Sequence, residues 1–140
     1  MIAYAESSAV LTWLLGEPEE AAIRQALAAA ERVVASTLTR VECARALARG
    51  VNTERLVRRD ELAALQLFDR VSASWSTLEL TGRVLDRACA RFPHEPVRTL
   101  DALHLATAAI FHEALGTLTV VSLDERIRKN AVSLGFLIAP

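Results

Sequence analysis

The residues of this chain best suited to chemistry are acids that stand where predicted strands end and predicted helices begin. Each one follows an apolar, strand-like run or lies in the first turn of a segment with helical spacing. A carboxylate in such a place is free to bind a ligand, because charged side chains are seldom packed unpaired in a core. These acids are Glu6, Glu42, Asp101 and Asp124.

Carboxylates that gather in one cleft, with no lysine or arginine among them, repel one another and need a cation to stay ionised. Oxygen ligands of this kind select Mg²⁺ or Mn²⁺, which keep several waters and bind substrate phosphates. Such ions activate water and stabilise the in-line displacement at a phosphodiester. The chemistry predicted from these residues is therefore metal-assisted hydrolysis of a nucleic-acid backbone.

Each acid also has a purely structural interpretation. Thr39 and Glu42 have the spacing of a capping box, which explains a glutamate near a helix start without catalysis. Acids at helix N-termini are stabilised by the helix dipole, which accounts for Asp101 and Asp124. Glu6 is then an ordinary exposed acid at a strand end. On the residues alone, the metal site and the structural roles both stay open.

The elements that must position the acids alternate between strand-like and helix-like patterns. Short apolar runs predict strands, and apolar residues at helical spacing predict a helix in each interval. Ser7 or Ser8 is suited to cap the first helix, and Gly16 to end it. The predicted strands cover residues 2–5, 32–36, 75–80, 118–123 and 136–139. The predicted helices cover residues 7–15, 18–30, 39–50, 53–71, 81–92, 99–110 and 124–134.

Strands that alternate with helices predict a mainly parallel sheet with helices on both faces, because parallel strands need crossover connections. The predicted fold is therefore an α/β, three-layer α/β/α sandwich, formed by a single domain over residues 1–140. In such folds ligands bind beyond the carboxyl ends of the strands. A parallel sheet would bring all of the acids to that rim, although they are far apart in the sequence.

Composition excludes several classes of protein. Apolar residues make up 52% of the chain, but charged residues interrupt every apolar run well before the roughly 18 residues of a membrane span. The N-terminus, MIAYAE, has no basic stretch, so we expect no signal peptide, no membrane partner and a cytoplasmic protein. The net charge of −1 offers no bulk basic surface to nucleic acid. Cys43 and Cys89 are predicted to be reduced, buried thiols.

A few basic residues lie near the predicted rim. Arg40 and Arg126 are candidate contacts to RNA phosphates, although solvated helix faces explain them as well. His104 follows Asp101 by one helical turn, and a packed or hydrogen-bonded histidine is favoured over a metal ligand. Zn²⁺ is not expected, because neither cysteine nor histidine clusters with the acids.

Several segments, in order, resemble the PIN-domain family and in particular its VapC-type toxin ribonucleases. Tyr4–Val10 (YAESSAV) is similar to the family's opening strand and turn, which Trp13–Pro18 (WLLGEP) continues. Thr39–Glu42 (TRVE) is similar to the second block. Arg98–Ala108 (RTLDALHLATA) is close to the family's most recognisable stretch, and Val120–Asp124 (VVSLD) resembles the last block. The resemblance covers nearly the whole chain.

The resemblance implies roles for individual residues. Carried over position by position, Glu42, Asp101 and Asp124 match the family's metal-binding acids, and Ser8 and Ser122 match hydroxyl positions beside the site. It also implies the PIN fold, a dependence on Mg²⁺ or Mn²⁺, and an RNA substrate. A homodimer and a small antitoxin protein that blocks the acidic cleft are the implied partners.

Glu6 departs from the family pattern, which usually has aspartate at this position. The departure favours a rival hypothesis, a non-catalytic PIN module with an impaired metal site that binds RNA or a protein partner. A third hypothesis is an unrelated α/β binding domain with incidental acids. We favour the toxin ribonuclease, in which Glu6, Glu42, Asp101 and Asp124 bind the metal and carry out catalysis.

Overall fold

The computed structural model describes residues 1–140 and contains one five-stranded sheet in which all neighbouring strands are parallel. The strands are β1 (Ile2–Ala5), β2 (Arg32–Ser36), β3 (Ser76–Leu78), β4 (Leu118–Val121) and β5 (Leu137–Ala139). Their order across the sheet is β3-β2-β1-β4-β5. Every segment predicted to contain a strand contains one, and the predicted parallel pairing is confirmed.

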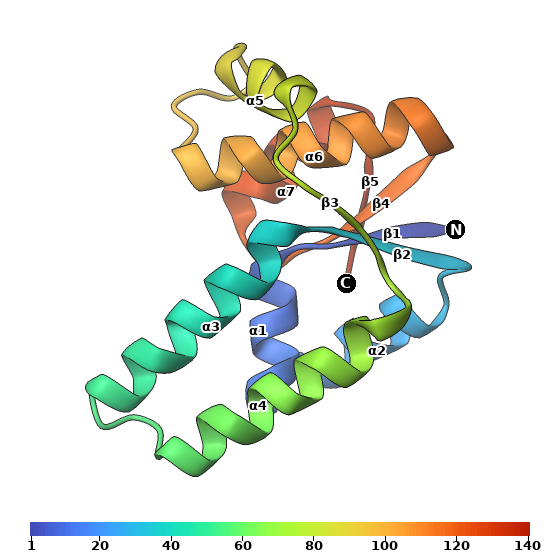
Figure 1. Ribbon diagram of the computed structural model, residues 1–140. Helices are drawn as coiled ribbons and strands as arrows, with labels where there is room; N and C mark the ends of the chain where they lie inside the picture. Colours follow the sequence, from blue (N-terminus) through green and yellow to red (C-terminus); the bar gives the residue numbers. More distant parts are fainter.

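Helices cover both faces of this sheet (Figure 1). One face carries α1 (Ser7–Leu15), α2 (Glu20–Ala28), α3 (Thr37–Asn52) and α4 (Arg58–Val71), followed by a 3₁₀ turn at Ser72–Ser74. The other face carries α5 (Gly82–Cys89), α6 (Thr99–Leu115) and α7 (Glu125–Ser133). The predicted three-layer α/β/α sandwich is confirmed. None of these helices combines the length and the apolar character needed to cross a membrane.

Two hydrophobic clusters, one on each face of the sheet, join the layers. Side chains alternate between them: Ala3 and Ala5 of β1 pack with α1 to α4, whereas Tyr4 packs with α6 and α7. In β2, Ala35 packs in the same cluster as Ala3 and Ala5, and Val34 packs in the same cluster as Tyr4. Because a parallel sheet is buried on both faces, its strands have continuous apolar sequences, and this is why they were recognisable.

The direction in which the chain crosses the sheet reverses between β1 and β4. From β1 the chain moves outward to β2 and β3 through helices on one face. It then returns to β4 and continues to β5 through helices on the other face. The connections after β1 and β4 therefore leave the same rim toward opposite faces, which opens a crevice between these two strand ends. Glu6 and Asp124 flank this crevice.

Two predicted helix caps are wrong. Glu6 caps α1, since its side chain accepts a hydrogen bond from the Ser8 N–H; neither Ser7 nor Ser8 is the cap. Helix α3 starts two residues before Thr39, and Ser36 is its cap. In both cases the cap directly follows or ends a strand, because a strand end already has the extended backbone that an N-cap requires.

Two predicted helices also start too early in the sequence. Helix α2 begins at Glu20 instead of Pro18, and α4 begins at Arg58 instead of Thr53. Before α4 the chain reverses tightly, and Leu56 lies over Gly50 so closely that a Cβ there would stand 2.8 Å from the leucine Cδ1. The Leu56 N–H donates to the Gly50 carbonyl, so this turn satisfies backbone groups that a longer helix would otherwise use.

Some apolar helix residues and one of the two cysteines are exposed. Val41 of α3 and Leu100 of α6 are 56% and 45% exposed, and both line the cleft described below. Cys43 is buried as predicted, whereas Cys89 is exposed; both thiols are free. Helical spacing identifies an apolar stripe but does not show whether it faces the core or a cleft.

Candidate active site

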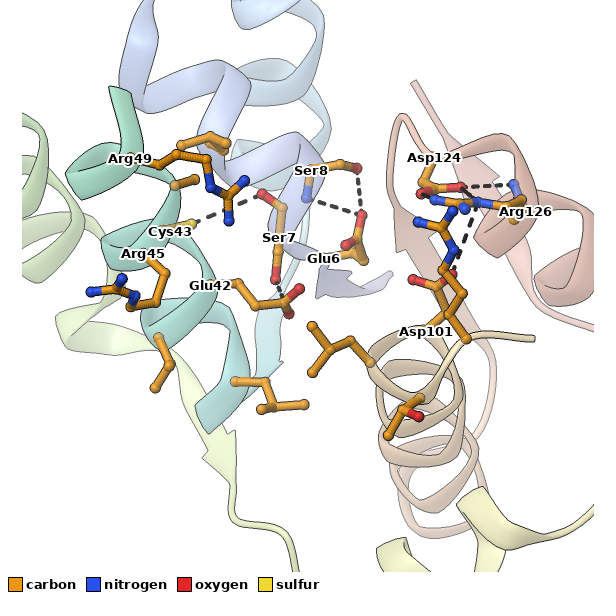
Figure 2. A pocket seen from close by; sticks show the side chains of 17 residues that line it. Glu6, Ser7, Ser8, Glu42, Cys43, Arg45, Arg49, Asp101, Asp124 and Arg126 are labelled. Carbon is orange, nitrogen blue, oxygen red and sulfur yellow. Dashed lines mark hydrogen bonds and ion pairs between the residues drawn. The ribbon is translucent and has the colours of Figure 1, made fainter. Parts of the chain in front are cut away.

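The predicted acids meet in one cleft of about 680 Å³ at the carboxyl rim of the sheet (Figure 2). Glu6 caps α1 at the end of β1, and Asp124 caps α7 after β4. Asp101 lies in the first turn of α6, as predicted. Glu42 lies in the second turn of α3 and not in the first, because this helix starts earlier than predicted. Helices α3 and α6 therefore face each other across the acidic cleft.

Glu6 is held by one of its two carboxylate oxygens. Its Oε2 accepts hydrogen bonds from the Ser8 N–H at 3.1 Å, from the Ser122 hydroxyl at 2.7 Å and from the Ser8 hydroxyl. The Ser8 hydroxyl in turn accepts from the Leu123 N–H at 2.9 Å. Ser8 and Ser122 thus lie beside the acids, and their hydroxyls hold the Glu6 carboxylate in place. The Oε1 atom has no hydrogen-bond partner in the protein.

Glu42 is held in the same way. Its Oε1 accepts from the Ser7 hydroxyl at 2.8 Å and pairs with the His104 Nε2, whereas Oε2 has no partner. Burial raises the pKa of Glu42, but the hydrogen bond and charge of His104, together with Ser7, outweigh burial and lower the pKa below its usual value. The predicted capping box is absent, because Thr39 lies inside the helix and donates instead to the Ala5 carbonyl at 3.3 Å.

Asp124 is paired with Arg126, which contradicts the expectation that no arginine lies among the acids. The Arg126 Nη2 lies 2.9 Å from Oδ2, its Nε lies 3.2 Å from Oδ1, and its backbone N–H donates to Oδ1 at 2.9 Å. These bonds lower the pKa of Asp124. Because Asp124 is the helix cap, its side chain turns back over the first turn and meets Arg126 there.

Asp101 has the fewest partners of the acids. Its Oδ2 is buried without a hydrogen bond, and the charged Arg126 Nε is 3.9 Å away. Burial raises the pKa of Asp101 and the charges of Asp124 and Glu6 raise it further, while Arg126 and His104 offset only part of this effect. An unpaired, buried carboxylate oxygen is costly, so a cation bound here would be stabilising.

The donor set fits a hard divalent cation in its chemistry. It combines unpartnered oxygens on Glu6, Glu42 and Asp101 with the carboxylate of Asp124, and Mg²⁺ and Mn²⁺ prefer such oxygens. As the side chains stand, no three acids, histidines or cysteines are close enough to hold one ion between them. Metal binding would therefore require the carboxylates to close on the ion and Arg126 to release Asp124.

Several arginines line the cleft without an ion pair. They are Arg45, Arg49 and Arg98. The first two follow Glu42 by one and two helical turns, so they lie on the same face of α3 as this acid. Arg40, the predicted phosphate contact, does not line the cleft, and its Nε pairs with Asp69 of α4 at 3.1 Å. The predicted position of Arg40 at the rim is therefore wrong.

Tyr4 and Ser7 also belong to the surroundings of the site, and no local sequence pattern indicated this. His104 is packed and hydrogen-bonded, as predicted, and only 1% exposed. The Tyr4 hydroxyl lies 2.7 Å from its Nδ1, and the Ser7 hydroxyl lies 3.0 Å from its Nε2. A tyrosine in a strand is normally interpreted as core, and here it is also a hydrogen-bond partner.

Comparison with known proteins agrees with this arrangement. The family model of the PIN domain matches residues 3–133. The chain belongs to the PIN-domain family. It is 39% identical to the ribonuclease VapC46 of Mycobacterium tuberculosis over 138 residues, which are 98% of this chain and 96% of that protein. The predicted membership in the VapC-type ribonucleases of the PIN-domain family is confirmed.

Two solved structures share the PIN fold of this chain. VapC20 of Mycobacterium tuberculosis, a toxin that cleaves the sarcin–ricin loop, has a TM-score of 0.68 at 17% identity and covers 99% of both chains. A toxin–antitoxin complex from Klebsiella pneumoniae has a TM-score of 0.63 at 16% identity, over 94% of this chain and 92% of that one. At these identities the likeness concerns the fold.

Asp101→Asn is expected to raise the melting temperature of the metal-free protein at neutral pH. The pKa of Asp101 is raised in the folded protein, so its ionised form costs stability above that pKa. This cost disappears as the pH falls through the raised pKa toward the ordinary value of an aspartate. The gain from asparagine should therefore be present at neutral pH and shrink on acidification, as measured by thermal melts in chelator over a pH series.

Asp86→Asn is the matched control for this measurement. Asp86 is exposed on α5 and forms no ion pair, so its replacement should leave the melting temperature unchanged over the same series. An Asp101→Asn protein that melts at or below the parental temperature at neutral pH would show that the Asp101 carboxylate is already compensated.

Proposed function

We propose that this chain is an endoribonuclease that depends on Mg²⁺ or Mn²⁺ and acts as the toxin of a type II toxin–antitoxin pair. The observation that carries the proposal is the acidic cleft, in which the buried Asp101 Oδ2 has no partner. The identity to a VapC ribonuclease over almost the whole chain supports RNA as the substrate.

The metal would be held by Glu6, Glu42, Asp101 and Asp124. When bound, it supplies positive charge at the scissile phosphodiester and lowers the pKa of water for the attack. The protein prepares two of its ligands in advance. Ser8 and Ser122 fix one oxygen of Glu6, and Ser7 and His104 fix one oxygen of Glu42, so the other oxygen of each remains available. Ligands fixed in this way lose little freedom when they bind.

Arg126 acts as the counter-ion of the acids while no metal is bound. Its guanidinium pairs with Asp124 and approaches Asp101, yet 53% of its side chain is exposed, so it is free to turn toward solvent. Once released, it stands beside the cleft, where it can contact a substrate phosphate. Arg126 would thus keep its predicted role as a phosphate contact and have a second role as the counter-ion of the acids.

The antitoxin is proposed to cover the same cleft. Exposed apolar side chains, Val41 of α3 and Leu100 of α6, lie next to the acids there. A protein segment with apolar residues and a basic side chain would match both features. The shared fold with a chain of a toxin–antitoxin complex supports such a partner. A homodimer is proposed from the family resemblance.

A second candidate function is RNA binding without cleavage. Two observations favour it. Glu6 stands where the family usually has aspartate, and Arg126 forms an ion pair with Asp124. The two candidates share the fold, the cleft and the arginines, and they differ in whether the bound RNA is cut.

The deciding experiment incubates the purified chain with RNA in Mn²⁺ or Mg²⁺, in chelator, and as the Asp101→Asn variant. We expect cleavage in metal only, and none by the variant, because it loses the least compensated acid of the site. Sequencing of RNAs cut after brief expression would then identify the substrate. Parental activity in Asp101→Asn would refute the assigned site, and a parent that binds RNA but never cuts it would favour the second candidate.

Glu6→Ala should slow cleavage at least about tenfold, whereas Glu6→Asp should stay within about a hundredfold of the parent. Alanine removes the carboxylate that Ser8 and Ser122 fix. Aspartate keeps it but is shorter by one methylene, about 1.5 Å of bond length. Cleavage rates in Mn²⁺ measure both variants. Equal rates for Glu6→Ala and the parent would remove Glu6 from the site, and an active Glu6→Asp in place of an inert parent would show that glutamate impairs it.

Arg45→Ala and Arg49→Ala should each weaken RNA binding and reduce its salt dependence. Each lost phosphate contact lowers the slope of log K against log salt concentration by about 0.7 for a single-stranded RNA. Fluorescence anisotropy of a labelled RNA in chelator measures both quantities without cleavage. Arg40→Ala is the matched control, because Arg40 is on the same helix but is paired with Asp69 outside the cleft. An equal loss in the control would mean that RNA does not follow this cleft.

A further inference from the structure

A buried chain of hydrogen bonds leads from the sheet to the Glu42 carboxylate. The Tyr4 hydroxyl lies 2.7 Å from the His104 Nδ1, and the His104 Nε2 pairs with the Glu42 Oε1. The Ser7 hydroxyl donates to the same Oε1 at 2.8 Å. Tyr4 and His104 are each 1% exposed, so water does not replace these contacts. The four residues come from β1, α1, α3 and α6. Their hydrogen bonds therefore connect α3 and α6, the helices that form the walls of the cleft.

The direction of the hydrogen bonds follows from the Glu42 carboxylate, which can only accept, so the His104 Nε2 beside it carries a proton. The Tyr4 hydroxyl beside Nδ1 is able to donate a hydrogen bond to it. In a neutral imidazole one nitrogen accepts and the other donates. A His104 that accepts from Tyr4 at Nδ1 therefore carries its proton on Nε2, which faces Glu42. In the neutral ring, a hydrogen bond from Tyr4 to Nδ1 therefore favours the tautomer that donates to the carboxylate.

The packing around His104 leaves its ring little freedom. Tyr4 meets the ring edge-on, with centroids 6.0 Å apart and planes at 78°, and Tyr4 itself packs against Phe111. The Glu42 side chain, by contrast, is 25% exposed and lies at the edge of the cleft. Without its bonds to Oε1, the long glutamate side chain would sample several rotamers. The His104 ring is therefore fixed by packing, and its contact with Oε1 orients the more exposed Glu42 side chain.

We propose that His104, backed by Tyr4 and assisted by Ser7, is the positioning residue of Glu42, holding Oε1 so that Oε2 is presented to a metal ion. This role rests on the metal site proposed above. Hydrogen-bond partners that fix a metal ligand typically contribute 10- to 100-fold in metal affinity, roughly the effect expected here. Mg²⁺ in particular requires ligand oxygens in near-ideal geometry.

The test compares variants of the full chain by their dissociation constant for Mn²⁺, measured by calorimetry. His104→Phe keeps an aromatic ring and removes the donor, and it should weaken binding about 10- to 100-fold. His104→Gln keeps an amide N–H able to reach Glu42 and should bind more tightly than His104→Phe. Val84→Ala, a change at a fully buried position of α5, is the control for general loss of stability and should leave Mn²⁺ affinity unchanged.

A double-mutant cycle separates positioning from a general structural effect. If His104 acts through Glu42, His104→Phe should cause no further loss of Mn²⁺ affinity in a Glu42→Ala background. An equal loss in both backgrounds, or parental affinity in His104→Phe, overturns the proposal. Should His104→Phe not fold, Tyr4→Phe removes only the hydroxyl behind the ring, and its loss of affinity should likewise vanish in the Glu42→Ala background.

Crystal structures in chelator give a readout that does not require the metal. In the parent, the Glu42 carboxylate should lie on Ser7 and His104 in one conformation, and in His104→Phe or Tyr4→Phe it should leave this position. A Glu42 that does not move in either variant overturns the positioning role. A parent that binds no Mn²⁺ refutes the proposed metal dependence instead, and the position of Glu42 still decides whether His104 orients it.

Discussion

The carboxylates of Glu6, Glu42, Asp101 and Asp124 gather at one end of the parallel sheet, where they repel one another. Negative charges in a partly buried cleft are unfavourable unless each is compensated. The compensation differs between the acids: serine hydroxyls bond to Glu6, His104 and Ser7 hold Glu42, and Arg126 pairs with Asp124. Asp101 receives the least, so its pKa stays raised and its Oδ2 stays unpaired. A bound cation would therefore be most stabilising beside Asp101.

The reversal of the chain between β1 and β4 explains why the carboxylates meet at all. The connections after these two strands leave toward opposite faces, so the strand ends are not covered by the chain that follows them. Helices from both layers then supply the walls, with Glu42 on α3 and Asp101 on α6. Because His104 lies on α6 and bonds to Glu42, the same contact that orients a carboxylate also joins the two walls.

The sequence predicted the parts of this arrangement that depend on local pattern and missed those that depend on packing. Strand β2 was predicted at its observed bounds, because an apolar run buried on both faces is distinctive. The contact between Tyr4 and His104 joins residues 100 positions apart, and no local pattern indicates it. The pairing of Asp124 with Arg126 was missed because residues two apart do not face each other within a helix. Asp124 is outside the helix, as its cap, and its side chain folds back.

The length of Glu6 shows how a site of this kind can accept a longer acid. An aspartate at a helix cap reaches the N–H two residues later with its short side chain. Glu6 makes the same bond, to Ser8 at 3.1 Å, and its extra methylene is taken up by this turn over the helix start, so that the residue stays 5% exposed. The carboxylate is then fixed by Ser8 and Ser122 and does not extend across the cleft. The Glu6 carboxylate is therefore positioned by two serine hydroxyls in addition to the backbone N–H of Ser8.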